Sequence, residues 1–179
     1  KTAGIQKNLT VVSLNPIQSA RVLLVNKEDA RETTFYIGGA GIRRDNPDFV
    51  AIDVVNTVFG GRFTSWLNDE LRVNSGLTYG ARSGFSPLKH SGTFSISTFT
   101  ATKTTEATLD KALQVLDSLH KKGIDEKTLT SAKNYVKGQF PPKYETPSQL
   151  AGLLTQMFWY GFDESYINNY VLKYVLFPF

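Results

Sequence analysis

Apolar and polar side chains alternate along several short stretches of the chain, most clearly around Phe35 and around Ile96. A period of two is typical of a half-buried β-strand, because successive side chains point to opposite faces of a sheet. A turn containing Pro87 separates two of these stretches and would join them as a hairpin. The predicted strands are residues 19–27, 32–41, 78–86 and 91–99.

Between and after these strands, apolar residues recur at helical spacing, and capping residues mark where several helices begin or end. Asp45 or Asn46 would cap the first helix, with Pro47 at its first position. Residues 146–149 read Thr-Pro-Ser-Gln, which is a capping-box pattern. The predicted helices are 47–59, 62–73, one from Thr104 or Thr105 to Gly123, 126–139 capped by Asp125, one opening at 146–149, and one beginning within 163–175.

Two of these helices have a predicted core face. The core residues expected in the helix 62–73 are Phe63, Trp66, Leu67 and Leu71. Those expected in the long helix after Thr104 are Leu109, Leu113, Leu116 and Leu119 or His120. Each set follows a spacing of three or four residues, which brings its members to one side of a helix.

The order of the predicted elements favours an α+β fold. Pairs of antiparallel strands alternate with groups of helices, which indicates a two-layer sandwich: a mainly antiparallel sheet with helices packed on one face. Residues 20–179 would form a single domain, and residues 1–19, polar and broken by Pro16, a linker or edge segment. The chain begins at Lys1 and ends in Val-Leu-Phe-Pro-Phe, and it reads as a piece of a longer protein.

Composition narrows the classes of function. The net charge of +4 is dispersed, without a stripe of cations and aromatics, so no nucleic-acid partner is predicted. There is no cysteine, which excludes a disulfide, a thiolate zinc site and a thiol nucleophile. No apolar run approaches the length of a membrane span.

Most familiar catalytic patterns are missing. His90 and His120 are the only histidines, and neither has a histidine or glutamate at helical spacing that would form a metal site. No nucleophilic-serine motif occurs, and the glycine-rich runs do not match phosphate-binding loops, so Gly60 and Gly61 are assigned packing roles. The adjacent carboxylates of Asp69 and Glu70 would point to different faces of a helix and be solvated.

Arg72 and Tyr79 are the remaining candidates, on either side of a Gly-Leu-Thr turn. The simpler interpretation is a surface arginine and a strand tyrosine with a solvated hydroxyl. The functional one is a donor pair that hydrogen-bonds carbonyl oxygens of a bound peptide. If a hydrolytic centre lay opposite, the tyrosine could stabilise a developing oxyanion.

Two longer motifs carry a family resemblance. One is G-G-R-F-T-S-x-L-N-x-E-L-R-x-x-x-G-L-T-Y-G, and the other A-K-x-x-x-x-G-x-F followed by E-T-P-x-x-L-A. Together they resemble the non-catalytic half of pitrilysin/insulinase-type zinc peptidases, the group that includes the mitochondrial processing peptidase. The resemblance covers roughly residues 20–170.

The resemblance implies a function that needs a second half. In this family one half carries an inverted zinc motif, His-x-x-Glu-His, and the other has the same fold without metal. This chain lacks that motif, so it looks like the metal-free half and should be inactive alone. Arg72 and Tyr79 match the arginine and tyrosine, seven residues apart, that reach toward the zinc centre of the partner in this family.

The implied assembly places zinc, a zinc-activated water and a glutamate base on the partner half, with an extended peptide as substrate. That partner is either a fused N-terminal domain or a separate subunit. An isolated half could also self-associate, and the family suggests the bacterial periplasm or cell envelope. A peptide-binding or structural scaffold without peptidase activity is the alternative, and an independent enzyme with an unrecognised site a third.

Overall fold

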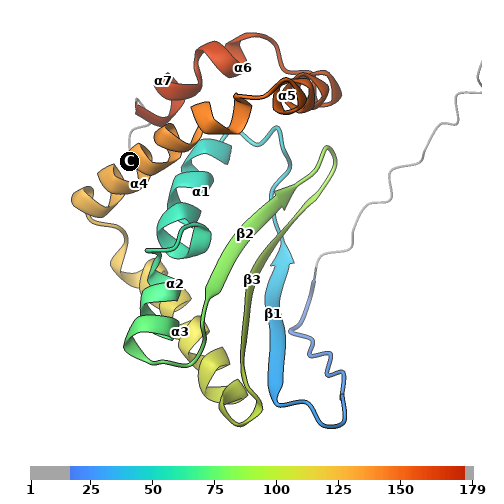
Figure 1. Ribbon diagram of the computed structural model, residues 1–179, viewed down its shortest axis with the longest axis vertical. Coiled ribbons are helices and arrows are strands. Elements are labelled where there is room, and N and C mark those ends of the chain that lie inside the picture. The colour runs from blue at the N-terminus through green and yellow to red at the C-terminus, as the bar shows by residue number, and fades with distance from the viewer. Residues whose placement is uncertain (1–16, 176–179) are drawn as a thin grey trace, which may run out of the picture.

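The computed structural model describes residues 17–175 and contains a three-stranded sheet beside a layer of helices (Figure 1). Most of the segment 1–19, predicted to be a linker or edge, therefore lies outside the described residues. The strands are β1 (Glu32–Ala40), β2 (Ala81–Pro87) and β3 (Gly92–Ala101). The helices are α1 (Phe49–Asn56), η1 (Thr57–Gly61), α2 (Trp66–Asn68), η2 (Asp69–Asn74), η3 (Thr102–Thr104), α3 (Thr105–Lys122), α4 (Glu126–Gln139), η4 (Pro141–Tyr144), α5 (Pro147–Tyr160), α6 (Ser165–Asn168) and α7 (Tyr170–Val175).

The sheet is antiparallel throughout, in the order β1-β3-β2. Ser97 on β3 lies opposite Tyr36 on β1 and opposite Arg82 on β2, which fixes the register of all three strands. Side chains alternate between the helix-covered face, with Ile96 fully buried, and the other face, where Tyr36 is exposed. The α+β class, the antiparallel sheet and the helical layer predicted from the sequence are thus confirmed.

The strand predicted at 19–27 is wrong for this structure, because the segment makes no strand pairing there. Its apolar residues have exposed fractions between 80% and 94%: Val22, Leu23, Leu24 and Val25. The backbone nearby turns at Lys27, whose carbonyl accepts from the Ala30 amide at 3.3 Å. High β-propensity alone does not make a strand, since a strand needs a partner for its backbone groups.

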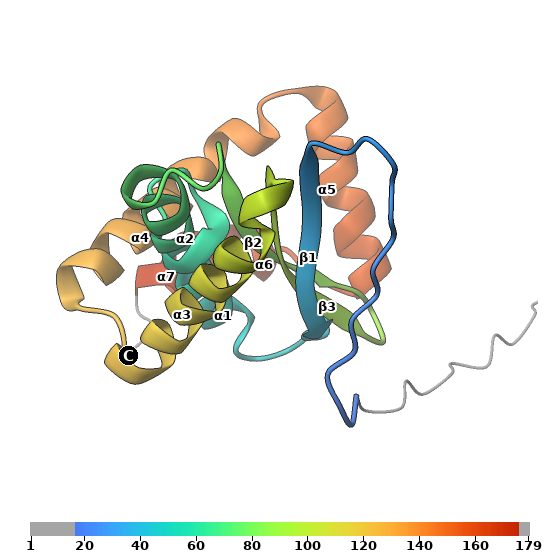
Figure 2. The ribbon, with the colours of Figure 1, turned by 90° about the horizontal axis from the view of Figure 1, so that it is seen from below.

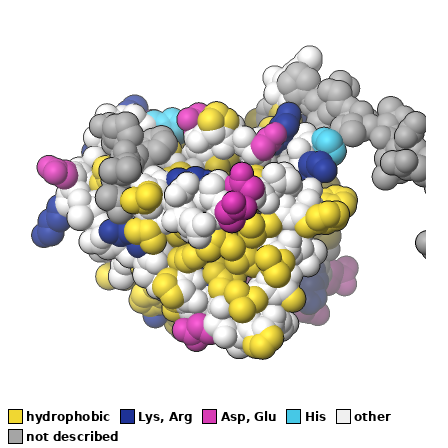
Figure 3. Space-filling model, turned by 90° about the horizontal axis from the view of Figure 1, so that it is seen from above, with side chains coloured by type: hydrophobic (Ala, Val, Ile, Leu, Met, Phe, Trp, Pro, Cys, Tyr) yellow, Lys and Arg dark blue, Asp and Glu magenta, His cyan; other side chains and the backbone are white. Residues whose placement is uncertain are grey.

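One helical layer covers one face of the sheet, and α5 lies outside it (Figures 1 and 2). The end of α5 contacts the β2–β3 turn, where the Lys89 ammonium donates to the Trp159 carbonyl at 3.3 Å. Several large apolar residues of α5 are exposed, including Leu154, Phe158 and Trp159. Seen from this end of the molecule, hydrophobic side chains gather on the surface (Figure 3). Within residues 17–175, no helix is long and apolar enough to cross a membrane.

The core consists of two clusters that share the half-buried ring of Trp66. The cluster against the sheet contains Phe59, Leu67, Leu71, Ala81, Ile96, Ala112 and Val115. The cluster between helices contains Val54, Val58, Ala132, Val136 and Tyr174. The first cluster anchors α2 and η2 to the strands, and η2 contains the candidate residue Arg72.

Several helix details differ from the predictions. The first helix begins at Phe49 with Asp48 as its N-cap, because the Asn46 side chain accepts from the Asp48 amide at 2.8 Å and forms a turn. In α3 the fully buried line is Thr108, Ala112 and Val115, whereas the predicted core residue Leu113 is exposed. Leu116 and Leu119 are partly buried and pack against the same cluster, so the observed core face lies about one residue before the predicted one.

The capping predictions at Asp125 and at residues 146–149 are confirmed, whereas Thr104 precedes α3 without a side-chain capping bond. The Asp125 carboxylate accepts from the Thr128 amide at 2.9 Å, and α4 runs from Glu126 to Gln139. Thr146 and Gln149 form the reciprocal capping box at the start of α5. Gly76 has a φ of 61°, the left-handed conformation that glycine adopts without steric cost.

Candidate functional site

Arg72 lies in η2, a π-helical turn that continues the short helix α2. The amide of Ser75 bonds the Glu70 carbonyl at 3.1 Å, five residues back, which is the wider π spacing. Leu71 is fully buried in the core and fixes this turn, so the adjacent Arg72 is directed outward and is half-buried. Such π-turns occur often at functional sites, and nothing in the apolar pattern of the sequence had indicated one.

The Arg72 guanidinium is stacked on an aromatic ring. Its Cζ lies 4.7 Å from the centroid of the Phe63 ring, within the range of a cation–π interaction. Phe63 was predicted as a core residue of a helix 62–73, but the helix begins only at Trp66, and the Phe63 ring is 69% exposed. The Ser65 side chain accepts from the Asn68 amide as the N-cap, so Ser65 was the sequence signal that could have placed Phe63 in a loop.

Tyr79 lies in the connection between η2 and β2, with its side chain 81% exposed. The backbone around it is held by threonine hydroxyls from the sheet. The Thr98 hydroxyl donates to the Gly80 carbonyl at 2.9 Å, and the Thr100 hydroxyl donates to the Leu77 carbonyl at 2.7 Å. The phenol therefore projects into solvent from a fixed stretch of chain.

A single buried amide connects the two sides of the site. The Asn68 side chain, 5% exposed, donates from Nδ2 to the Phe63 carbonyl at 2.7 Å. Its Oδ1 accepts from the Ala81 amide at 3.0 Å, at the first residue of β2. Asn68 is part of the family motif, but nothing in the sequence indicated that its side chain would join the Phe63 loop to β2.

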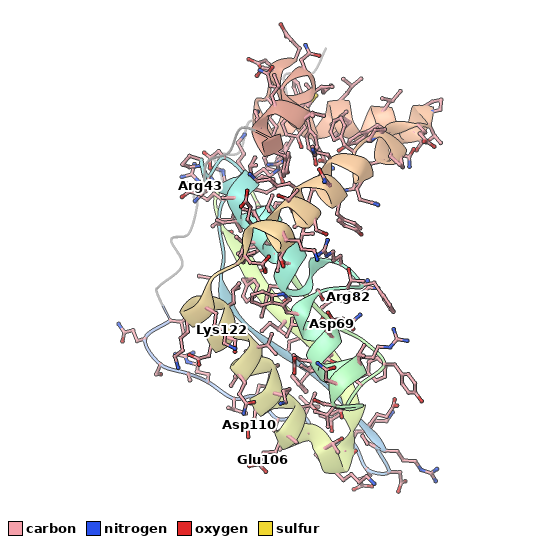
Figure 4. The ribbon with its side chains drawn as sticks, turned by 90° about the vertical axis from the view of Figure 1, so that its left-hand side faces the viewer. Arg43, Asp69, Arg82, Glu106, Asp110 and Lys122 are labelled. Carbon is pink, nitrogen blue, oxygen red and sulfur yellow. The ribbon has the colours of Figure 1, made fainter. Side chains whose placement is uncertain are left out.

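The π-turn and the loop after it provide two kinds of hydrogen-bond donor. Arg72 offers a planar guanidinium with several N–H groups, and Tyr79 offers a single phenolic O–H. Both can donate to carbonyl or oxyanion oxygens, and neither can act as a nucleophile or hold a metal here. Two of the charged side chains labelled in Figure 4 lie on adjoining elements: Asp69 at the start of η2, and Arg82 on β2, the strand that follows Tyr79.

Metal-ligating side chains do not cluster in the described part of the chain. Between residues 17 and 175, no group of three or more histidine and carboxylate side chains is close enough to hold a metal ion. His90 lies exposed in the β2–β3 turn and His120 exposed in the last turn of α3. These residues do not fit a zinc site.

A cavity of about 730 Å³ lies elsewhere, between the start of α1 and helices α6 and α7. Its central side chain is Arg44, whose guanidinium lies 4.1 Å from the centroid of the Phe49 ring and donates to the Tyr166 hydroxyl at 2.7 Å. The rings of Tyr160 and Phe162 also lie within 6 Å of it. We interpret these contacts as structural, because they join α6 and the end of α5 to the beginning of α1.

A family model and a curated relative both match most of this chain. The model of the peptidase M16 inactive domain matches residues 6–136. A Helicobacter pylori protein described as non-peptidase homolog YmxG is 28% identical over 149 residues, which are 79% of this chain and 34% of that protein. This chain thus spans about a third of the length of that relative.

Solved structures agree with this match. The peptidase M16 inactive domain from Pseudomonas fluorescens superposes with a TM-score of 0.77 at 30% identity, covering 83% of this chain and 35% of that one. The inactive peptidase domain of a putative zinc protease from Bordetella parapertussis superposes with a TM-score of 0.69 at 16% identity. That match covers 87% of this chain and 84% of the Bordetella chain, and at this identity it shows the fold alone.

Proposed function

The chain belongs to the peptidase M16 family as one of its inactive domains, and from that premise we propose that it completes the active site of a zinc metalloendopeptidase. In this proposal it supplies Arg72 and Tyr79 to a peptide bound against the catalytic half. The observation that carries the proposal is the exposed phenol of Tyr79 on a hydrogen-bonded loop that directly follows the π-turn carrying Arg72. The catalytic half would be a fused domain or a separate subunit.

Tyr79 would stabilise the transition state. As a peptide carbonyl becomes tetrahedral, negative charge develops on its oxygen, and a donor already in position lowers the energy of that state. The threonine contacts at Leu77 and Gly80 support this role, because they fix the loop before substrate arrives. Losing one such donor typically lowers turnover by about 100-fold or more.

Arg72 would bind the substrate backbone. A guanidinium forms two parallel hydrogen bonds to suitably placed oxygen atoms, which fixes the orientation of the bound chain. A carbonyl next to the scissile bond is the oxygen we assign to it. Since the described residues do not fit a zinc site, the zinc of this enzyme would be held entirely by the other half.

The test uses the chain together with its catalytic half, whether fused or encoded beside it. Zinc-dependent cleavage of a short peptide is measured for this chain alone, for the assembly, and for the assembly with a chelator. We expect activity only in the assembly without chelator. In that assembly, Tyr79→Phe should lower kcat by about 100-fold, and Arg72→Lys should lower kcat/KM while retaining the positive charge.

The matched control for Tyr79→Phe is Tyr135→Phe, which removes a hydroxyl from a partly exposed tyrosine in the helical layer. This control should leave kcat unchanged. Unchanged kcat in Tyr79→Phe would refute the role in transition-state stabilisation. Cleavage by this chain alone would refute the proposal of a complementary half.

A peptide-binding scaffold without peptidase activity is the second candidate. It is favoured by one observation, the description of the Helicobacter pylori relative as a non-peptidase homolog. In the same experiment it predicts that the assembly binds peptide but does not cleave it. Arg72→Ala should then weaken peptide binding, whereas Tyr79→Phe should have little effect because no oxyanion forms.

A further inference from the structure

Asn68 makes the contacts that connect the surroundings of Arg72 with those of Tyr79. Its amide is buried and makes one hydrogen bond in each direction: as donor to the Phe63 carbonyl and as acceptor from the Ala81 amide. The orientation of the amide follows from these partners. A carbonyl can only accept and a backbone N–H can only donate, so the reverse orientation would satisfy neither bond.

On one side, the Asn68 contact fixes the residue that supports the arginine. Phe63 lies in the loop between η1 and α2, and its ring stacks against Arg72 at 4.7 Å. The ring is 69% exposed, so packing does little to hold it in place. The bond from Asn68 holds the Phe63 backbone instead, and thereby the position of the ring under the guanidinium.

On the other side, the contact fixes the start of β2, two residues after Tyr79. The Ala81 amide would otherwise be a buried donor without a partner at this point, since Ala81 is almost fully buried. Asn68 lies four residues before Arg72 on the same helical segment. The Asn68 side chain therefore contacts both the Phe63 loop, whose ring stacks on Arg72, and the first residue of β2, just after Tyr79.

We propose that Asn68 is a positioning residue that sets the distance between Arg72 and Tyr79 by joining the Phe63 loop to the first residue of β2. This inference rests on the proposed function, because it assigns Asn68 a role at that same site. Asn68 touches neither substrate nor reacting atoms. It would affect catalysis indirectly, by setting the positions of Arg72 and Tyr79.

The informative variant is Asn68→Asp, which is nearly isosteric. It retains an acceptor for the Ala81 amide, but it replaces the donor to the Phe63 carbonyl with a second oxygen, which repels that carbonyl. A second variant, Phe63→Leu, keeps the backbone carbonyl that Asn68 uses and removes only the exposed ring. Because Phe63 is exposed, this variant should fold even if Asn68→Asp does not.

The first readout is spectroscopic and independent of activity. In the assembly with arginine selectively labelled, the side-chain signals of Arg72, assigned by their loss in Arg72→Lys, should be shifted upfield by the Phe63 ring. Phe63→Leu should abolish this ring-current shift, and Asn68→Asp should reduce it by more than half. An unchanged shift in folded Asn68→Asp overturns the inference. If Asn68→Asp does not fold, an unchanged shift in Phe63→Leu overturns it.

The second readout separates positioning from a general effect on folding. Asn68→Asp should lower kcat/KM about tenfold in the wild-type background and by less than twofold when Arg72→Ala and Tyr79→Phe are already present. An equal loss in both backgrounds would mean that Asn68 acts only through stability, and it would overturn the inference. If the ring-current shift falls as expected but Arg72→Ala and Tyr79→Phe leave turnover unchanged, the positioning stands and the proposed function fails.

Discussion

The Tyr174 hydroxyl donates to Asp53 Oδ2 at 2.9 Å and so joins helix α7 to helix α1. Tyr174 is 2% exposed and belongs to the cluster between helices, whereas Asp53 has no cationic partner within salt-bridge distance in residues 17–175. Burial raises the pKa of Asp53 above its ordinary 3.8 by more than the Tyr174 hydrogen bond lowers it. Because the pKa of Asp53 is raised in the folded state, the ionisation of this residue makes the free energy of unfolding depend on pH.

Replacing Asp53 with asparagine should remove this pH dependence. Because the native pKa is raised, the folded state binds more protons than the unfolded state above pH 3.8, so the free energy of unfolding decreases as pH rises through the native pKa. Asparagine keeps an oxygen that accepts from Tyr174 but carries no charge. The variant should therefore gain stability relative to wild type as the pH rises from about 4 to about 7. Urea unfolding at a series of pH values measures this gain.

The control for this prediction is Asp53→Ala. It also lacks the charge, but it leaves the Tyr174 hydroxyl without a partner, which costs about 1–3 kcal/mol. Asparagine should thus be the more stable of the two variants at every pH. A difference between wild type and Asp53→Asn that stays constant with pH would contradict the raised pKa.

Adding a methyl group at Gly60 should strongly destabilise the fold. A Cβ at this position would collide with the Ser83 side-chain oxygen and lie 2.5 Å from the Ser83 backbone nitrogen, which cannot move without disturbing β2. Overpacking of this kind costs about 1–3 kcal/mol, and we expect Gly60→Ala at or above the upper end. Chemical denaturation of the variant measures this loss directly.

Gly138→Ala is the matched control. Gly138 lies within α4, and a Cβ there would meet no atom within 4 Å. Alanine has the higher helix propensity, so this variant should gain about 0.5–1 kcal/mol. If both variants changed stability in the same direction, the close approach of η1 to β2 would be wrong. The result would also test the packing role that the sequence assigned to Gly60.

The capping box of α5 predicts a smaller effect. Thr146→Ala removes the side chain that accepts from the Gln149 amide at 3.3 Å, and loss of an N-cap typically costs about 0.5–2 kcal/mol. Thr155→Ala, in the same helix, removes a hydroxyl that bonds only the Ala151 carbonyl of the preceding turn, and it should be neutral or slightly stabilising. Thermal unfolding of both variants distinguishes a cap from an ordinary threonine.

Features formed by residues close together in the sequence could be predicted from it, whereas features that depend on distant residues could not. Caps such as Asp125 and Thr146 were predicted correctly because the interacting groups are three residues apart. The strand at 19–27 was not, because pairing depends on a neighbour distant in sequence. Leu113 was misplaced because the buried line of α3 consists of the smaller residues Thr108, Ala112 and Val115, which a search for leucine spacing does not find.

The difference between local and long-range features also explains which residues of the candidate site were predicted. Arg72 and Tyr79 were found through a motif, and their assigned roles remain predictions. Phe63 and Asn68 were not found as site residues, because their contacts depend on the π-turn and on the return of the chain into β2. The π-turn is defined by the bond from the Ser75 amide to the Glu70 carbonyl, and no spacing rule in a single sequence reveals it.

Thr100 offers a test of how the sheet supports the Tyr79 loop. Its hydroxyl donates to the Leu77 carbonyl at 2.7 Å and accepts from the buried Thr108 hydroxyl at 3.0 Å. Thr100→Val keeps the shape of the side chain and removes both bonds, together with the bond of 2.7 Å between the Thr100 and Thr104 hydroxyls. The buried Thr108 hydroxyl can still donate to the Thr104 carbonyl at 2.8 Å, so the lost partner is that of the Leu77 carbonyl. Leaving this carbonyl without its donor should cost about 1–3 kcal/mol of unfolding free energy.

Ser97→Ala is the control, because Ser97 is on the same strand but only partly buried and takes no part in this network. It should change the unfolding free energy by less than about 0.5 kcal/mol. If the network holds the loop before substrate binds, Thr100→Val should also lower kcat of the assembled enzyme under conditions where the variant remains folded. If Thr100→Val shows the expected loss of unfolding free energy but an unchanged kcat, the loop keeps its conformation without Thr100, and its rigidity comes from the Thr98 contact to Gly80.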